Sequence, residues 1–193
     1  MFYRKLCCLI NSNLKSNLKG ELYSKRYDFI KWFEINNIEN FDLYGYKWDK
    51  KNILLFGRNI YLPSFFSSNL ISYKGRANNK IKTLSNYKFS ICFENTHLEK
   101  DYISEKIFDC FLANTVPIYL GCPNINELIP KNSFIDYRDF KNKEELYNFI
   151  TNISKEKYSE YINNINLFLE SESIKKYTLN SGLRMKKFYL EIM

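Results

Sequence analysis

The sequence is poor in the residues and segments that mark several classes of protein. It contains 6 glycines and 4 prolines in 193 residues, which excludes collagen-like and linker-like chains. Its longest apolar runs, Leu6–Ile10 and Ile53–Phe56, are far shorter than the roughly 20 residues that a transmembrane helix needs. The basic residues near Met1 precede only a short apolar patch, without a credible signal cleavage site. We therefore expect no membrane segment in this chain and no independent entry into the secretory route.

Patterns typical of metal and redox sites are also missing. His97 is the single histidine, and no Cys-x-x-Cys pair occurs among the five cysteines. An odd number of cysteines, most of them inside apolar runs, indicates buried free thiols in a reducing compartment. Without recurrent ligand spacing, a zinc site is not expected. The sequence therefore predicts no metal centre.

The familiar phosphate-binding motifs are absent as well. There is no Gly-rich dinucleotide fingerprint, no Walker-type Gly-Lys-Ser/Thr and no Asp-x-Asp. These absences argue against hydride transfer and nucleoside triphosphate hydrolysis. An enzyme that acts on a nucleotide-linked substrate would then neutralise the diphosphate with side chains and helix dipoles rather than with a chelated divalent metal. We accordingly expect no cofactor and no metal requirement.

Aromatic and basic residues are abundant. Aromatic residues make up 18% of the chain, with 16 Tyr and 16 Phe, which supplies enough apolar surface for a core and argues against disorder. The formal net charge is +8, and the lysines are scattered along the whole sequence. This charge fits either a solvated basic surface or a cleft for an anionic ligand, and charge alone does not separate the two. Nucleic acid is the weaker alternative, because no basic stripe is interleaved with aromatic residues.

The apolar pattern alternates between strand and helix. Buried strands are predicted at residues 3–10, 41–44, 87–93, 116–120 and 134–135, and helices at 25–36, 79–84, 105–113, 143–153, 157–169 and 183–192. Ser24 and Ser104 are the expected caps of two of these helices. Residues 47–76 are interpreted as loops around a small strand. This alternation predicts one α/β domain over residues 1–193, built on a Rossmann-like parallel sheet and followed by a helical tail from about residue 143.

The best candidate site follows the strand predicted at 87–93. A polar loop with Asn95 and Tyr102 leads to a helix that begins after Ser104, and Lys106 lies in its first turn. Free backbone N–H groups and the helix dipole favour an anion there, so a lysine at that end indicates an anionic partner. The alternative is a solvent-facing Lys106 that pairs with a neighbouring carboxylate of Glu105 or Asp101.

Arg26, near the start of the first predicted helix, is a second candidate. Its planar guanidinium matches the geometry of phosphate oxygens. The alternative interpretation is an exposed helical arginine without a ligand.

Three segments together resemble the signature of a known family. Residues Tyr87–Asn95, Asp101–Lys106 and Thr115–Gly121 follow in order the signature of the alpha-1,3-fucosyltransferases, glycosyltransferase family 10. The match continues through Pro130–Phe140, and earlier through Ser12-Asn13, Arg26, Phe29 and Asp42 to Gly45. The resemblance therefore covers most of the chain.

This resemblance implies the C-terminal, donor-binding half of a GT-B glycosyltransferase. Family members transfer L-fucose from GDP-fucose to an N-acetylglucosamine or glucose unit of a glycan, with inversion at the anomeric carbon. By resemblance, Arg26 and Lys106 hold the diphosphate, Glu105 and Tyr102 contact ribose or fucose, and Asn95 closes the strand. Ser104 replaces the more usual threonine of the motif and keeps its hydroxyl.

The resemblance assigns no catalytic residue to this chain. The general base of the family is expected in an N-terminal, acceptor-binding domain, and Glu94 and Glu105 lie within the donor motif. Two hypotheses follow: a fucosyltransferase, or a non-catalytic GDP-fucose-binding module that depends on a separate acceptor-binding domain or chain. Family members act at the Golgi membrane in eukaryotes and from the cytoplasm in bacteria, and this sequence favours neither location.

Overall fold

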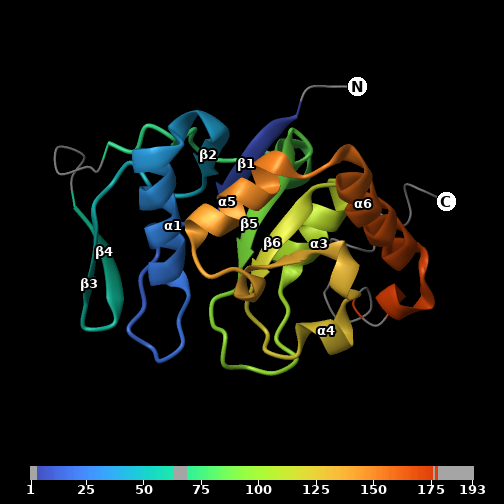
Figure 1. Ribbon diagram of the computed structural model, residues 1–193. Helices are drawn as coiled ribbons and strands as arrows, with labels where there is room; N and C mark the ends of the chain where they lie inside the picture. Colours follow the sequence, from blue (N-terminus) through green and yellow to red (C-terminus); the bar gives the residue numbers. More distant parts are fainter. Residues whose placement is uncertain (1–3, 63–68, 176, 178–193) are drawn as a thin grey trace.

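A five-stranded parallel sheet organises the described part of the chain. The computed structural model describes residues 4–62, 69–175 and 177. The strands lie in the order β2-β1-β5-β6-β7, and every neighbouring pair is parallel (Figure 1). Their bounds are β1 Lys5–Ile10, β2 Phe41–Tyr44, β5 Tyr87–Phe93, β6 Val116–Leu120 and β7 Ile135–Asp136. The predicted α/β class with a parallel sheet is therefore confirmed.

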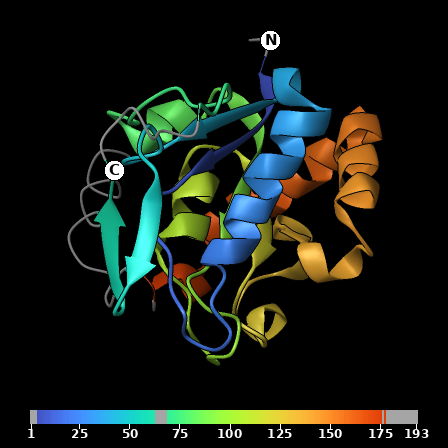
Figure 2. The same ribbon diagram turned by 90° about the vertical axis from the view of Figure 1, so that its left-hand side faces the viewer.

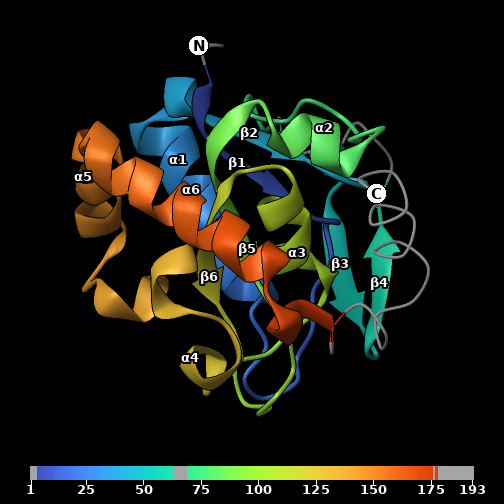
Figure 3. The same cartoon turned by 90° about the vertical axis from the view of Figure 1, so that its right-hand side faces the viewer.

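Helices cover both faces of the sheet. Their bounds are α1 Tyr23–Asn36, α2 Lys80–Leu84, α3 Glu105–Leu112, α4 Ile125–Leu128, α5 Lys143–Asn152 and α6 Lys155–Glu170. Figures 2 and 3 show α1 and α5 on one side of the sheet and α2 and α3 on the other. Aromatic contacts join the helices, such as Trp32 with Tyr147 and Phe111 with Phe168. Because both faces are covered, the central strands are mostly apolar, with exposed lysines only near their starts, at Lys5 and Lys88.

The cysteines belong to this core. Cys7 and Cys8 lie in β1, Cys92 in β5 and Cys110 in α3, and all of them, with Cys122, are buried free thiols. Burial raises the pKa of the Cys7 and Cys8 thiols above the ordinary value. The prediction of buried, unpaired cysteines is confirmed.

Several predicted boundaries need correction. The helix predicted from residue 25 begins at Tyr23, and Ser24 is not its cap. The N-cap position is Leu22, and the carboxylate of Glu21 accepts the hydrogen bonds of the Ser24 backbone N–H and hydroxyl. A carboxylate just before the helix thus replaces the capping hydroxyl. The helix predicted at 157–169 extends over Lys155–Glu170, because Ser154 caps it. The helix predicted at 183–192 lies outside the described residues.

Residues 47–76 contain more structure than predicted. Two strands, β3 (Asn52–Leu55) and β4 (Arg58–Tyr61), pair in a separate antiparallel hairpin instead of one small strand in loops. The turn consists of Phe56 and Gly57, both with positive φ, at 47° and 73°. This conformation is that of the tight turn that joins twisted strands, and asparagine or glycine ordinarily occupies its first position. The short helix α4 was likewise not predicted.

A buried acid ties the edge strand β2 to the neighbouring strands β1 and β5. Asp42 of β2 accepts hydrogen bonds of 2.6 Å from both the Lys5 ammonium and the Tyr87 hydroxyl, and the Lys74 ammonium lies 3.6 Å away. Burial raises the pKa of Asp42, but the hydrogen bonds from Lys5 and Tyr87 and the two positive charges outweigh it. The net pKa is lowered. Asp42 therefore stabilises the fold above the ordinary carboxyl pKa, and this contribution is lost as the pH falls through the lowered value.

We predict that Asp42→Asn lowers the free energy of unfolding by about 1–3 kcal/mol at neutral pH, because a charged acceptor of buried hydrogen bonds is lost. The difference from the wild type should shrink as the pH falls through the lowered carboxyl pKa. Urea unfolding at several pH values measures this. Asp49→Asn, at an exposed aspartate, is the matched control and should be nearly neutral. A destabilisation by Asp42→Asn that does not change with pH would contradict the prediction.

Candidate functional site

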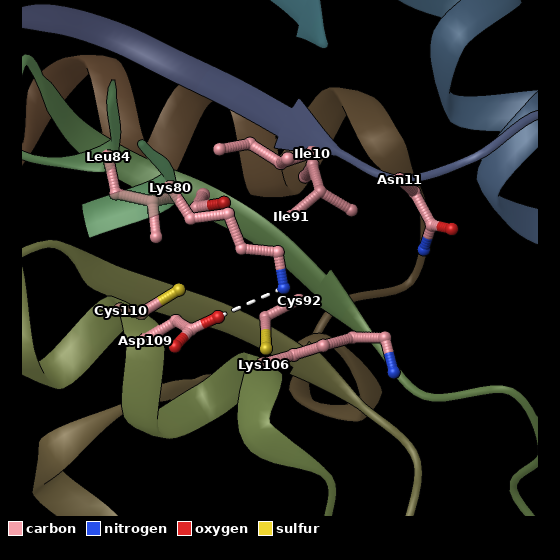
Figure 4. Close-up of a pocket in the computed structure, with 10 residues that line it drawn as sticks. Ile10, Asn11, Lys80, Leu84, Ile91, Cys92, Lys106, Asp109 and Cys110 are labelled. Atoms are coloured by element: carbon pink, nitrogen blue, oxygen red, sulfur yellow. Dashed lines mark hydrogen bonds and ion pairs between the residues drawn. The ribbon is translucent and has the colours of Figure 1, made fainter. Parts of the chain in front are cut away.

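The sheet itself points to the position of a ligand. From β1 the chain forms β2 on one side and then crosses to β5 on the other, so the strand order reverses between β1 and β5. Open α/β sheets bind ligands beyond the carboxyl ends of the strands at such a reversal. A pocket lies there, and Figure 4 shows its lining: Ile10, Asn11, Lys80, Leu84, Ser90, Ile91, Cys92, Lys106, Asp109 and Cys110.

Lys106 in the first turn of α3 enters this pocket and is paired. Its ammonium lies 3.0 Å from a carboxylate oxygen of Glu94 and 2.8 Å from the Ser104 hydroxyl. Its side chain is mostly buried, so the alternative of a solvent-facing lysine is wrong. That alternative also expected Lys106 to pair with Glu105 or Asp101, and this expectation is wrong because the ion-pair partner of Lys106 is Glu94.

Glu94 organises the turn between β5 and α3. Its side chain is 0% exposed, and it accepts hydrogen bonds from the Ser104 backbone N–H at 2.9 Å and the Ser104 hydroxyl at 2.6 Å. With Lys106, these donors compensate the cost of burying a carboxylate. A side chain at Gly121 would place its Cβ 2.5 Å from Cγ of Glu94, so only glycine leaves room for this arrangement. Ser104 is the N-cap of α3, as predicted.

Arg26 of α1 lies on the other side of the same strand end. The residue is 2% exposed, so the alternative of an exposed helical arginine is wrong. Its Nη2 donates to the carbonyl oxygens of Phe93 and Glu94, at 2.9 and 2.5 Å, and to the Asn95 side chain at 3.0 Å. Burial lowers the pKa of Arg26, although nearby Tyr23 and Glu94 oppose this effect.

One donor of this guanidinium remains unused. The buried Nη1 of Arg26 has no hydrogen-bond partner in the described part of the chain. Buried polar groups are nearly always paired in folded proteins. A buried, charged donor without a partner at the carboxyl end of β5 indicates that an anionic acceptor completes the site.

Two other predicted residues join the cluster, and a third faces elsewhere. Asn95 bridges Arg26 to Tyr102, whose hydroxyl lies 3.4 Å from the amide nitrogen of Asn95. Burial raises the pKa of Tyr102. Glu105 is half-exposed and pairs with Lys80 of α2 at 3.4 Å. The structure therefore brings Arg26, Asn95, Tyr102 and Lys106 to one end of β5, with Glu105 at the border toward α2.

Sequence reasoning missed Glu94 and Lys80 as parts of the site. Lys80 extends toward Asp109, and their charged groups are 3.0 Å apart (Figure 4). Glu94 carried a usable signal, because it directly follows a predicted buried strand and the nearby helix start offers N–H and hydroxyl donors to a carboxylate. Lys80 carried none, since its position depends on the packing of α2 against α3.

Two features are absent from the residues that the structure describes. In that part of the chain, histidine, cysteine, aspartate and glutamate side chains form no group of three or more that could hold a metal ion. None of the helices described here has the length and apolar character to cross a membrane.

Comparison with known proteins identifies the family. The model of the C-terminal part of glycosyltransferase family 10 (fucosyltransferase) matches residues 4–189. The chain belongs to this family.

Similar proteins that are named as fucosyltransferases support the family 10 assignment. The chain is 43% identical over 72 residues to the alpha-(1,3)-fucosyltransferase FucT of Helicobacter pylori, covering 37% of this chain and 15% of that protein. It is 40% identical over 89 residues to the mouse 4-galactosyl-N-acetylglucosaminide 3-alpha-L-fucosyltransferase 9, covering 44% of this chain and 24% of the relative. The chain thus matches less than a quarter of the length of each relative.

A solved structure supports the same fold. The crystal structure of an alpha1,3-fucosyltransferase with GDP-fucose is similar, with a TM-score of 0.57 and 27% identity. The similarity covers 82% of this chain and 38% of that one. The predicted resemblance to family 10, a family of GT-B enzymes, is confirmed.

In this family 10 chain, Glu94→Gln should lower the free energy of unfolding by about 1.5–3 kcal/mol, because hydrogen bonds to a buried charged group are weakened. Urea unfolding measures the change. Glu160→Gln is the control, since Glu160 pairs with Lys157 on the surface and should contribute less than about 1 kcal/mol. Equal effects of the two substitutions would show that Glu94 does not organise the site.

Proposed function

We propose that this chain is the donor-binding part of a fucosyltransferase that uses GDP-fucose. The observation that carries the proposal is the buried Nη1 of Arg26, which has no hydrogen-bond partner among the described residues and lies at the carboxyl end of β5, as does Lys106. Membership of family 10 and the similar structure determined with GDP-fucose support this donor. By this proposal residues 1–193 act as one donor-binding domain.

The diphosphate is bound by two cations and the start of a helix. Arg26 offers Nη1 from one side and Lys106 its ammonium from the other, while α3 directs its N-terminal dipole to the same place. As the bond from fucose to GDP breaks, negative charge develops on the diphosphate, and preorganised cations stabilise it. These side chains supply the neutralisation, so no metal or other cofactor is required.

Two of the remaining predicted residues contact the sugar part of the donor. Tyr102 and Asn95 stand beside Arg26, and Glu105 lies one residue before Lys106. We assign Tyr102 and Glu105 to ribose or fucose and Asn95 to the closure of the strand end. Transfer goes with inversion to an N-acetylglucosamine or glucose unit of a protein or lipid glycan. We assign the general base to an acceptor-binding part rather than to the donor site described above.

Donor binding can be tested without disrupting the fold. Lys106→Gln keeps a hydrogen-bond donor for Glu94 but removes the charge, and Arg26→Lys keeps the charge but removes the planar fork. Each should weaken GDP binding about tenfold or more, because a charge-assisted contact is lost. Calorimetric titration with GDP measures the affinity, and EDTA should leave it unchanged.

Lys157→Gln, at an exposed surface pair, is the control and should bind GDP like the wild type. Thermal unfolding verifies that each variant is folded. Unchanged GDP affinity in both folded site variants would reject the proposed donor site.

A non-catalytic, partner-dependent binding module is the second candidate. The observation that favours this candidate is the extent of the structural similarity, which covers only 38% of the fucosyltransferase solved with GDP-fucose. Incubation of the chain with GDP-fucose and N-acetyllactosamine separates the two functions. Fucosylated product above the level of Lys106→Gln indicates a transferase, whereas GDP binding without product indicates a module that needs an acceptor-binding partner.

A further inference from the structure

The β3–β4 hairpin has its polar and apolar faces reversed. Its cross-strand pairs place Asn52 opposite Tyr61 and Ile53 opposite Ile60, so side chains alternate between two faces. The face toward the rest of the protein is largely polar, with Leu54 as its one aliphatic residue. Asn52 is buried there, and both Asn52 and Tyr61 donate hydrogen bonds of 2.8 Å to the Asn13 carbonyl oxygen. A hairpin on a soluble domain ordinarily turns its apolar face inward.

The outward face carries the apolar residues. Ile53, Leu55 and Ile60 are all exposed, and Phe56 at the turn is 94% exposed. In Figures 1 and 2 the hairpin stands apart from the five-stranded sheet. We name Ile53, Leu55, Phe56 and Ile60 the hairpin patch. Exposed contiguous apolar groups of this kind mark interaction surfaces.

Phe56 is also unfavourable for the turn that it occupies. Its φ of 47° lies in the left-handed region, which asparagine or glycine adopts far more readily than a bulky aromatic residue. Since its ring is almost fully exposed, packing within the described chain does not compensate for this conformation. An unfavourable turn residue that contributes no packing to the fold indicates that Phe56 serves a function other than stability.

The charges around the hairpin patch identify the partner. Residues 46–76 contain six basic residues and one acid, Asp49, and so carry +5 of the net charge of +8. Arg58 lies opposite Leu55 on the outward face, and Lys51, directly before β3, is exposed. Apolar side chains surrounded by cations match the boundary between anionic headgroups and acyl chains.

We propose that the hairpin patch docks this chain on an anionic lipid surface, with Phe56 inserted at the interface and the surrounding cations on the headgroups. The hairpin is hydrogen-bonded to the loop after β1, whose Asn11 lines the candidate pocket. Docking therefore orients the carboxyl edge of the sheet relative to the lipid. This inference does not depend on the donor or on catalysis.

Flotation of the full chain with vesicles tests the proposal. The wild type should bind vesicles that contain phosphatidylglycerol, bind phosphatidylcholine vesicles much less, and lose binding as salt is raised. Phe56→Asn should reduce vesicle binding about tenfold or more, because the aromatic ring that would be transferred from water into the lipid interface is lost. The same substitution suits the turn, so its melting temperature should be unchanged or higher.

Leu167→Asn is the matched control, because Leu167 on α6 is 65% exposed and lies outside the hairpin. It should bind vesicles like the wild type. Absence of wild-type binding, or equal binding by wild type and Phe56→Asn, overturns the proposal. Sedimentation that shows self-association abolished by Phe56→Asn assigns the patch to a second copy instead. If RNA displaces both the wild type and Phe56→Asn from vesicles equally, the basic surface binds nucleic acid and the lipid proposal is overturned.

Discussion

The side-chain carboxylate of Glu94 is fully buried at the end of strand β5, and three other residues bind to Glu94 through its carboxylate or its backbone carbonyl. It accepts the first hydrogen bonds of α3 through Ser104, and it holds the ammonium of Lys106. Its backbone carbonyl accepts a hydrogen bond from Arg26 on the opposite face of the sheet. A single residue thus joins a strand, two helices and two cations, and Gly121 is confined to glycine because Glu94 occupies the adjacent space.

This arrangement keeps cations ready at a place where burial would otherwise disfavour them. The carboxylate of Glu94 compensates the charge of Lys106, while Arg26 donates hydrogen bonds to the backbone carbonyls of Phe93 and Glu94. Arg26 and Lys106 thus form a fixed positively charged region near the reversal of the strand order. In the described part of the chain, Nη1 of Arg26 has no hydrogen-bond partner. Fixed dipoles and charges of this kind need little reorganisation when an anion binds, which suits the stabilisation of a departing diphosphate.

Continuous apolar patterns explain which elements could be predicted. The strands 41–44, 87–93 and 116–120 agree with the structure at both ends, because strands of a covered parallel sheet are apolar on both faces. The hairpin was missed for the opposite reason. Ile53, Leu55 and Ile60 point outward, whereas Asn52 and Asn59 point inward. An alternating pattern that normally indicates a buried apolar face therefore describes an exposed one in this hairpin.

The sequence by itself determined the α/β class, the cap at Ser104 and the family, since these depend on local patterns and on residues in a particular order. Only the tertiary structure decided that Arg26 is buried, that Lys106 pairs with Glu94, and that Phe56 is exposed. Arg26 reaches carbonyl groups 67 and 68 residues away along the chain, so its environment exists only after the sheet brings α1 against the end of β5. A pattern in the sequence states which groups are present, whereas burial and pairing depend on which distant segments the fold places beside them.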